Sequence, residues 1–169
     1  MDKNVIDLLK TKLENSKEVK VRKYSNYDYE DVKNLMIELA KIYKTKFNEE
    51  IWLKAIKKRQ FQNQKLTIVA ELNKKVVGVC FLDFHWNDLG LLIGTIKHLT
   101  VNEAYRDKGI ATKIMMYIFN VIQEMEVHKI RVNIAQATEK LDKYFKMFGF
   151  KPIYHALERD LKEIKFPFS

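Results

Sequence analysis

The stretch Leu99-Thr-Val-Asn-Glu-Ala-Tyr-Arg-Asp-Lys-Gly-Ile-Ala-Thr112 joins an apolar segment to the most regular helical pattern in the chain. The apolar residues that lead into it predict a strand over 91–101, and apolar residues at helical spacing predict a helix over 110–126. The first N–H groups of a helix have no intrahelical acceptor, and the helix dipole adds partial positive charge at the same end. A strand end, a short turn and a helix start therefore meet in this stretch.

The turn between the strand and the helix has the composition of an anion cradle. Gly109 lets a ligand approach the backbone closely, and Ala111 adds little bulk beside it. Arg106 and Lys108 add full positive charges next to the helix start. These features predict a site for a pyrophosphate, with a basic turn that only caps a core helix as the alternative. A P-loop and a Rossmann fingerprint are excluded because their residue spacings are absent.

Hydrophobic periodicity predicts the elements around this stretch. Helices are expected over 4–14, from an N-cap at Asp28 to Tyr43, over 49–61 and over 141–148. Strands are expected over 19–24, 66–72, 76–82, 91–101 and 129–135, with one or two more within 150–160, a hairpin turn at Asn73-Lys74 and a break of the long strand at Gly94. This order predicts one α+β domain with a mixed sheet.

The composition is that of one globular domain. The chain has 169 residues, 47% hydrophobic and 31% charged, which excludes a disordered chain. Cys80 is the only cysteine, so an internal disulfide and a cysteine-based metal cluster are excluded, and its apolar surroundings predict a buried small hydrophobe.

The distribution of apolar and charged residues indicates which compartment and which partners to expect. No apolar run reaches the ~20 residues that span a bilayer, and the mixed charges of the first residues argue against a secretory signal. We therefore expect a cytoplasmic protein without a membrane partner. The net charge of +9 favours an anionic partner. Because this charge is spread along the chain and no nucleic-acid-binding motif is visible, nucleic acid is not the expected partner.

Four segments resemble the GNAT superfamily, the acetyl-CoA-dependent N-acetyltransferases. Arg106-Asp-Lys-Gly109-Ile-Ala111 matches the family signature Arg/Gln-x-x-Gly-x-Gly/Ala. Lys143–Phe150 is similar to the family's late helix ending in Gly-Phe, Val76–Cys80 to its third strand and His155–Leu161 to its closing strand. The resemblance covers about 19–161, so we expect an N-terminal helical extension over 1–18 and a GNAT-like domain over 19–169.

The resemblance implies a mixed, mostly antiparallel central sheet with helices on both faces, and acetyl-CoA as co-substrate without a metal. Loop N–H groups from Arg106 to Ala111 would hold the pyrophosphate, and Leu99 and Val101 would pair with the pantetheine arm where the family's strands splay apart. The implied coenzyme-binding residues are Leu99, Thr100, Val101, Arg106, Asp107, Lys108, Gly109, Ile110, Ala111, Thr112 and Phe145. The family often forms dimers, so a homodimer is one expected assembly.

The implied reaction is direct transfer of an acetyl group to a primary amine. A neutral amine attacks the thioester, a backbone N–H near residues 99–101 stabilises the oxyanion, a base takes the ammonium proton and an acid serves the leaving thiolate. Many family members place a Tyr acid where this chain has Phe145, and Tyr144 lies one residue earlier, about 100° around the helix. Thr138 stands where the same members often carry an Asn. Tyr144 and His98 are the catalytic candidates.

His98 is the first candidate for the base, because imidazole titrates near neutrality and the residue lies on the strand beside the expected coenzyme. His85, in the loop before that strand, is the second. Asp83 and Glu71 are alternatives only if their side chains turn inward, and water-mediated deprotonation stays open.

We therefore expect an N-acetyltransferase whose acceptor is the amine of a small molecule or a protein. Residues 28–65 and the turn over 84–91 would choose the acceptor, with Phe84, His85 and Trp86 as an aromatic wall. The alternative is an acyl-CoA-binding sensor or complex subunit with little catalytic activity, which the missing Tyr and the unassigned base support.

Overall fold

The computed structural model describes residues 3–134 and 138–154, and the chain divides into two compact units, residues 1–136 and 137–169. The first unit holds a five-stranded sheet in the order β1 (Lys20–Lys23), β2 (Lys65–Leu72), β3 (Lys75–Trp86), β4 (Leu92–Val101) and β5 (Lys129–Val132). The first three pairings are antiparallel, and β4 pairs with β5 in parallel. The predicted mixed, mostly antiparallel sheet is confirmed.

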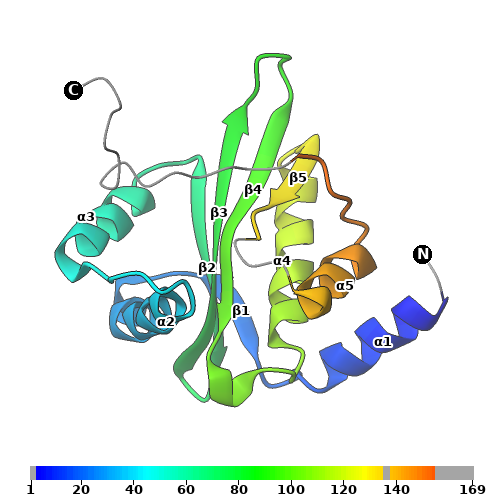
Figure 1. Ribbon diagram of the computed structural model, residues 1–169, viewed down its shortest axis with the longest axis horizontal. Coiled ribbons are helices and arrows are strands. Elements are labelled where there is room, and N and C mark those ends of the chain that lie inside the picture. The colour runs from blue at the N-terminus through cyan, green and yellow to red at the C-terminus, as the bar shows by residue number, and fades with distance from the viewer. Residues whose placement is uncertain (1–2, 135–137, 155–169) are drawn as a thin grey trace, which may run out of the picture. The chain divides into compact units, whose positions relative to one another are not determined.

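Helices cover both faces of this sheet (Figure 1). On one face, α2 (Tyr29–Ile42) and α3 (Glu49–Gln60) pack Val32, Leu35 and Ile56 onto Val79 and Phe81 of β3. On the other face, α4 (Ile110–Glu124) lies so close to β3 that a Cβ on Gly78 would touch the Ile114 side chain. The α1 helix (Lys3–Glu14) packs against α4. No helix among residues 3–134 and 138–154 is long and apolar enough to cross a bilayer.

The β2–β3 hairpin forms where the sequence predicts it. Asn73 and Lys74 both have positive φ, 51° and 62°, which suits the tight two-residue turn that joins antiparallel strands. The third strand is longer than expected, because it continues to Trp86 and includes Phe84, which is buried at 4% exposure. The predicted aromatic wall is therefore wrong for Phe84: side chains alternate along a strand, and this buried ring packs over Gly94 of the neighbouring strand.

Asp28 occupies the position before α2, as predicted, but its carboxylate does not cap that helix. It accepts two hydrogen bonds of 2.7 Å from the Arg22 guanidinium and one of 2.7 Å from the Ser25 N–H. Burial opposes the charged form of Asp28, yet the hydrogen bonds from Arg22 and Ser25 outweigh it and hold the pKa of this carboxyl below its ordinary value. Arg22 also contacts Glu71 at 2.6 Å, so one cation joins β1, β2 and the start of α2.

The second unit contains α5 (Glu139–Met147), whose N-cap is Thr138. The Thr138 hydroxyl accepts a hydrogen bond of 3.2 Å from the Leu141 N–H. Residues 150–154 of this unit form no strand, and residues 155–160, where the rest of the predicted closing strand falls, lie outside the described residues.

Candidate functional site

The fourth strand changes its surroundings halfway along its length. Its first half, from Ile93 to Ile96, pairs with β3 on one edge and β5 on the other. The last hydrogen bond to the β5 side runs from the Asn133 N–H to the Ile96 carbonyl at 3.2 Å. Beyond this point the ladder to β5 stops, while pairing with β3 continues to Val101. The half of β4 over 97–101 is therefore separated from the β5 ladder, at the residues where the resemblance expects the pantetheine arm.

A β-bulge lies where the pairing between β4 and β5 ends. Phe81 of β3 lies opposite His98, and Leu82 lies opposite Ile96, so Lys97 is an extra residue on β4. The break predicted at Gly94 is wrong, because Gly94 pairs regularly with Phe84. A bulge bends its strand locally, and this one directly follows the last residue of β4 that pairs with β5.

The separated half of β4 offers backbone groups to a ligand. The Asn102 N–H donates to the Val77 carbonyl at 2.9 Å, so it points toward β3. Because N–H directions alternate along a strand, the N–H groups of Leu99 and Val101 point to the opposite, open edge. These are the two residues expected to pair with an extended ligand.

The loop after β4 winds tightly before α4 begins. Asp107 and Gly109 have positive φ, 62° and 79°, and Lys108 between them does not. Such alternation brings successive N–H groups to one concave side, which suits an anion. In the described part of the chain, the N–H groups of residues 108–112 donate to no other element. The start of α4 thus keeps the unsatisfied donors that an anion site needs.

The charged side chains of this loop lie at its surface. Arg106, Asp107 and Lys108 are exposed. The Arg106 Nε donates to the Val101 carbonyl at 3.1 Å, which holds the guanidinium against the open edge of β4. The Lys108 ammonium lies 5.2 Å from the centre of the Tyr105 ring. Both cations therefore border the loop N–H groups.

Gly109 itself is buried, and the chain supplies what covers it. A Cβ built on Gly109 would overlap the carbonyl oxygen of Lys12 in α1. Gly109 does permit close backbone approach, as predicted, but the group that approaches in this structure is a peptide carbonyl of the N-terminal helix. Ile110 and Thr112 are also buried, at 2% and 1% exposure, whereas Ala111 is half-buried.

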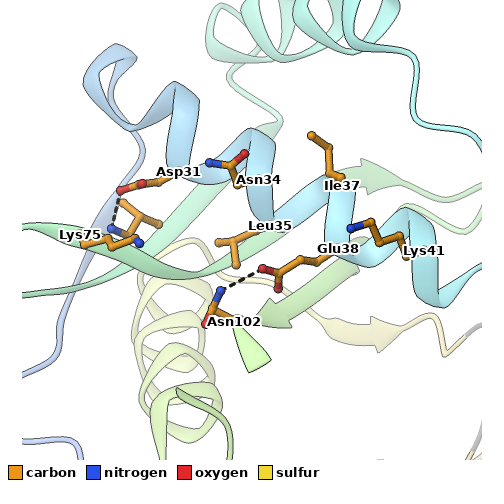
Figure 2. Close-up of a pocket in the computed structure, with 9 residues that line it drawn as sticks. Asp31, Asn34, Leu35, Ile37, Glu38, Lys41, Lys75 and Asn102 are labelled. Carbon is orange, nitrogen blue, oxygen red and sulfur yellow. Dashed lines mark hydrogen bonds between the residues drawn. The ribbon is translucent and has the colours of Figure 1, made fainter. Parts of the chain in front are cut away.

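A polar pocket of about 330 Å³ lies on the α2 side of this loop (Figure 2). At its edge, the Asn102 amide donates to Glu38 at 2.9 Å, and the Asn102 side-chain oxygen accepts from the Ala104 N–H at 3.1 Å. At the other edge, the Asp31 carboxylate accepts from the Val76 N–H at 2.8 Å. Asn102 therefore fixes the first turn of the loop to α2, a role that the sequence analysis missed although an Asn directly after a strand is a typical capping residue.

His98 lies just after the bulge, with its side chain on the α2 face of the sheet. Its ring centre is 6.0 Å from that of Phe81 and 6.3 Å from that of Tyr43. Its Nδ1 is buried and has no hydrogen-bond partner among the described residues. Burial, helped by the nearby charges of Lys97 and Arg59, lowers the pKa of His98 below its ordinary value. The imidazole is therefore neutral at pH 7 and has a free ring nitrogen.

The other base candidates are placed less favourably. Asp83 forms an ion pair with Arg59 at 2.5 Å and lies 3.8 Å from the Lys97 ammonium, and Glu71 is paired with Arg22. His85 is exposed on β3.

Cys80 is fully buried, as expected, and burial raises the pKa of its thiol to about 12, so it is not a nucleophile at neutral pH. Among the described residues, no group of three or more His, Cys, Asp and Glu side chains could hold a metal ion.

Tyr144 and Phe145 belong to α5 in the second unit. Their ring centres are 5.2 Å apart, and Tyr144 is the same distance from Phe148. Phe145 is buried at 6% exposure and meets Phe150 edge-on at 5.6 Å. Both rings pack within an aromatic cluster of their own unit, and their roles in catalysis and coenzyme binding stay predictions.

Solved structures with the same fold include several acetyltransferases. A transcriptional regulator from Bacillus halodurans C-125 superimposes with a TM-score of 0.75 at 17% identity, over 85% of this chain and 99% of that one. Glucosamine-6-phosphate N-acetyltransferase from Arabidopsis thaliana gives 0.70 at 14% identity, over 85% and 98%. Ribosomal-protein-alanine N-acetyltransferase from Brucella melitensis biovar Abortus 2308 gives 0.70 at 16% identity, over 85% and 99%. At these identities the likeness establishes the fold alone.

The sequence itself identifies the family. A comparison with curated protein sequences gives no significant match. The family model described as the acetyltransferase (GNAT) family matches residues 33–150, a span that contains the separated half of β4, the loop after it and all of α4. Because this match covers more than half of the chain, the protein belongs to the GNAT family of acetyltransferases.

Proposed function

We propose that this GNAT protein transfers the acetyl group of acetyl-CoA directly to a primary amine of a small molecule or a protein. The observation that carries the proposal is the separated half of β4, which ends at a loop of unsatisfied N–H groups. An open strand edge suits the amide-rich arm of the coenzyme, and a helix start flanked by Arg106 and Lys108 suits its diphosphate.

The residues present fit this co-substrate. Leu99 and Val101 offer backbone donors on the open edge, and the loop over 106–112 offers donors and two cations at its end. One contact must change, because Lys12 covers Gly109. When bound, acetyl-CoA would supply an acyl group already activated as a thioester.

His98 is the residue that we assign to proton removal from the amine. A lysine-like amine has a pKa near 10.4, so at pH 7 nearly all of it is protonated and unreactive. Neutral His98 can accept this proton at an imidazole nitrogen, either directly or through a water. A new C–N bond then forms as the C–S bond breaks, and the thiolate leaves without a compulsory acid because thiolates are adequate leaving groups.

A second function, acyl-CoA binding with little turnover, is supported by one observation. Phe145, at the position of the family's Tyr acid, is buried in an aromatic cluster and has no hydroxyl to donate. A GNAT subunit that senses acyl-CoA would need the binding site and not the acid.

One experiment separates the two functions. Thiol release from acetyl-CoA is followed with a panel of amino acids, polyamines, aminosugars and peptides, alongside the melting temperature with and without acetyl-CoA. The enzyme predicts a higher melting temperature and amine-dependent thiol release. Stabilisation without release for any amine supports the sensor, and an unchanged melting curve at millimolar acetyl-CoA contradicts both.

A further inference from the structure

The C-terminal end of α1 meets the start of α4 (Figure 1). The Lys12 carbonyl lies against Gly109, where not even a Cβ would fit. The Lys113 ammonium, in the first turn of α4, donates to the Ser16 carbonyl at 2.8 Å and to the Lys17 carbonyl at 3.2 Å. Ser16 is 1% exposed, so the bond to its carbonyl is partly shielded from water.

In this contact, the end of α1 occupies the start of α4 as an anion would. The last carbonyls of a helix carry partial negative charge, and the first N–H groups of a helix carry partial positive charge. Here the carbonyl end of α1 faces the N–H end of α4, and Lys113 points at carbonyls of the turn that directly follows α1. The partly negative carbonyl end of α1 thus lies beside the N–H groups that would bind a diphosphate under the proposed function.

We propose that α1 is an autoinhibitory cover, which must leave Gly109 before the coenzyme's diphosphate can settle at the start of α4. This inference rests on the proposed function. A diphosphate oxygen needs the space that the Lys12 carbonyl now fills, so the two cannot occupy it together. The apparent affinity for coenzyme is then the intrinsic affinity multiplied by the fraction of molecules whose cover is open.

The cover is held by few contacts, as a displaceable element should be. Leu9 is the one residue of α1 that is buried among residues 4–14, at 8% exposure, while Ile6 and Leu8 remain 38% and 49% exposed. Ser16 reinforces the end of the helix, because its hydroxyl donates to the carbonyls of Lys12 at 3.3 Å and Leu13 at 3.1 Å. Loosening either residue should raise the open fraction without touching the loop over 106–112.

The test compares Leu9→Ala with Leu8→Ala in the full chain. Both substitutions make the same chemical change on the same helix, but only the first truncates a buried side chain of the helix that packs on α4. Titration calorimetry with coenzyme A should give a Kd about tenfold lower for Leu9→Ala and within about twofold of wild type for Leu8→Ala. Ser16→Ala should shift the Kd in the same direction by less. Far-UV circular dichroism confirms that each variant is folded.

A second readout follows the cover itself. In wild type, hydrogen exchange of the α1 amides should speed up when coenzyme A is added, because binding displaces the helix. An unchanged or weaker affinity for folded Leu9→Ala, or slower exchange in α1 with coenzyme bound, would overturn the cover and leave the transferase proposal standing. Absence of coenzyme binding in both wild type and Leu9→Ala would instead overturn the proposed function, and the cover with it.

Discussion

The two halves of β4 share one strand and differ in what borders them. The half over 92–96 has β3 on one edge and β5 on the other, and its backbone groups are used within the sheet. The half over 97–101 keeps only β3, and its free edge leads to the loop that starts α4. One extra residue at the bulge, Lys97, separates a structural half from a half able to bind a ligand.

An Asn, a Gly and a His lie near each half, so each substitution near the open half has a matched control near the closed half. The closed half has Asn87, Gly90 and His85 near its turn, and the open half has Asn102, Gly109 and His98. If function belongs to the open half, matched substitutions should have unequal effects. Paired variants can therefore test whether the two halves differ in function.

The largest difference is expected for Gly109→Glu against Gly90→Glu. Both glycines have positive φ, 79° and 71°, so each change carries a similar backbone cost, about 1–2 kcal/mol. Space around Gly90 is open, whereas a side chain on Gly109 meets Lys12 and places an anion where the diphosphate would bind. Acetyl-CoA should raise the melting temperature of wild type and Gly90→Glu and leave that of Gly109→Glu unchanged. If acetyl-CoA raised the melting temperatures of both variants equally, the loop around Gly109 would not be part of the coenzyme site.

The next difference is expected for His98→Gln against His85→Gln. Loss of a general base typically slows a reaction by about 10²-fold to 10⁴-fold, so kcat should fall at least about 10²-fold for His98→Gln. The coenzyme Kd should stay within about twofold, because His98 lies on the α2 face, where it contacts Tyr43 and Phe81. His85→Gln should retain wild-type kcat, since His85 is exposed on β3, opposite Ile93 of the closed half. Steady-state rates with a saturating amine measure both, and unchanged kcat in His98→Gln would favour water-mediated deprotonation.

The pH profile sharpens the same assignment. A base works when it is deprotonated, and the pKa of His98 lies below the ordinary 6.5 of a histidine because of its burial and nearby cations. For kcat/KM corrected for the ionisation of the amine, activity should be constant above pH 6.5 and should fall only as the pH drops through this lowered pKa. A midpoint above 7 would contradict His98 as the base.

The smallest difference is expected for Asn102→Ala against Asn87→Ala. Asn102 ties the loop to Glu38 of α2, and Asn87 ties the β3–β4 turn through the N–H groups of Leu89 and Leu91. Loosening the loop should raise KM for acetyl-CoA about three- to tenfold and change kcat less, whereas loosening the turn should leave both unchanged. An equal rise in KM for both variants would indicate a general loss of stability.

Periodic patterns predicted most of the fold. The apolar faces of α4 and of the hairpin strands are local signals, and the structure reproduces these elements with small shifts at their ends. The turn composition likewise located the loop around Gly109, and its positive φ confirms why a glycine stands there.

Contacts between distant segments could not be predicted in the same way. The Lys12 carbonyl that covers Gly109 is a backbone group, and any residue at position 12 would supply it. No glycine or proline stands at the bulge to indicate it, so the break of the strand was predicted at Gly94 instead of Lys97. Asp28 binds Arg22 rather than its own helix, because a partly buried guanidinium that donates two hydrogen bonds competes better for a carboxylate than a helix N–H group does.

The most direct measurement is amide-resolved hydrogen exchange of the full chain with and without coenzyme A. The proposal predicts slower exchange at the N–H groups of Leu99 and Val101 and at the loop over 106–112. Residues 92–96, which β3 and β5 already pair on both edges, should not change. Protection absent from Leu99, Val101 and the loop, or spread evenly over both halves of β4, would contradict the assignment of the coenzyme site to the open half.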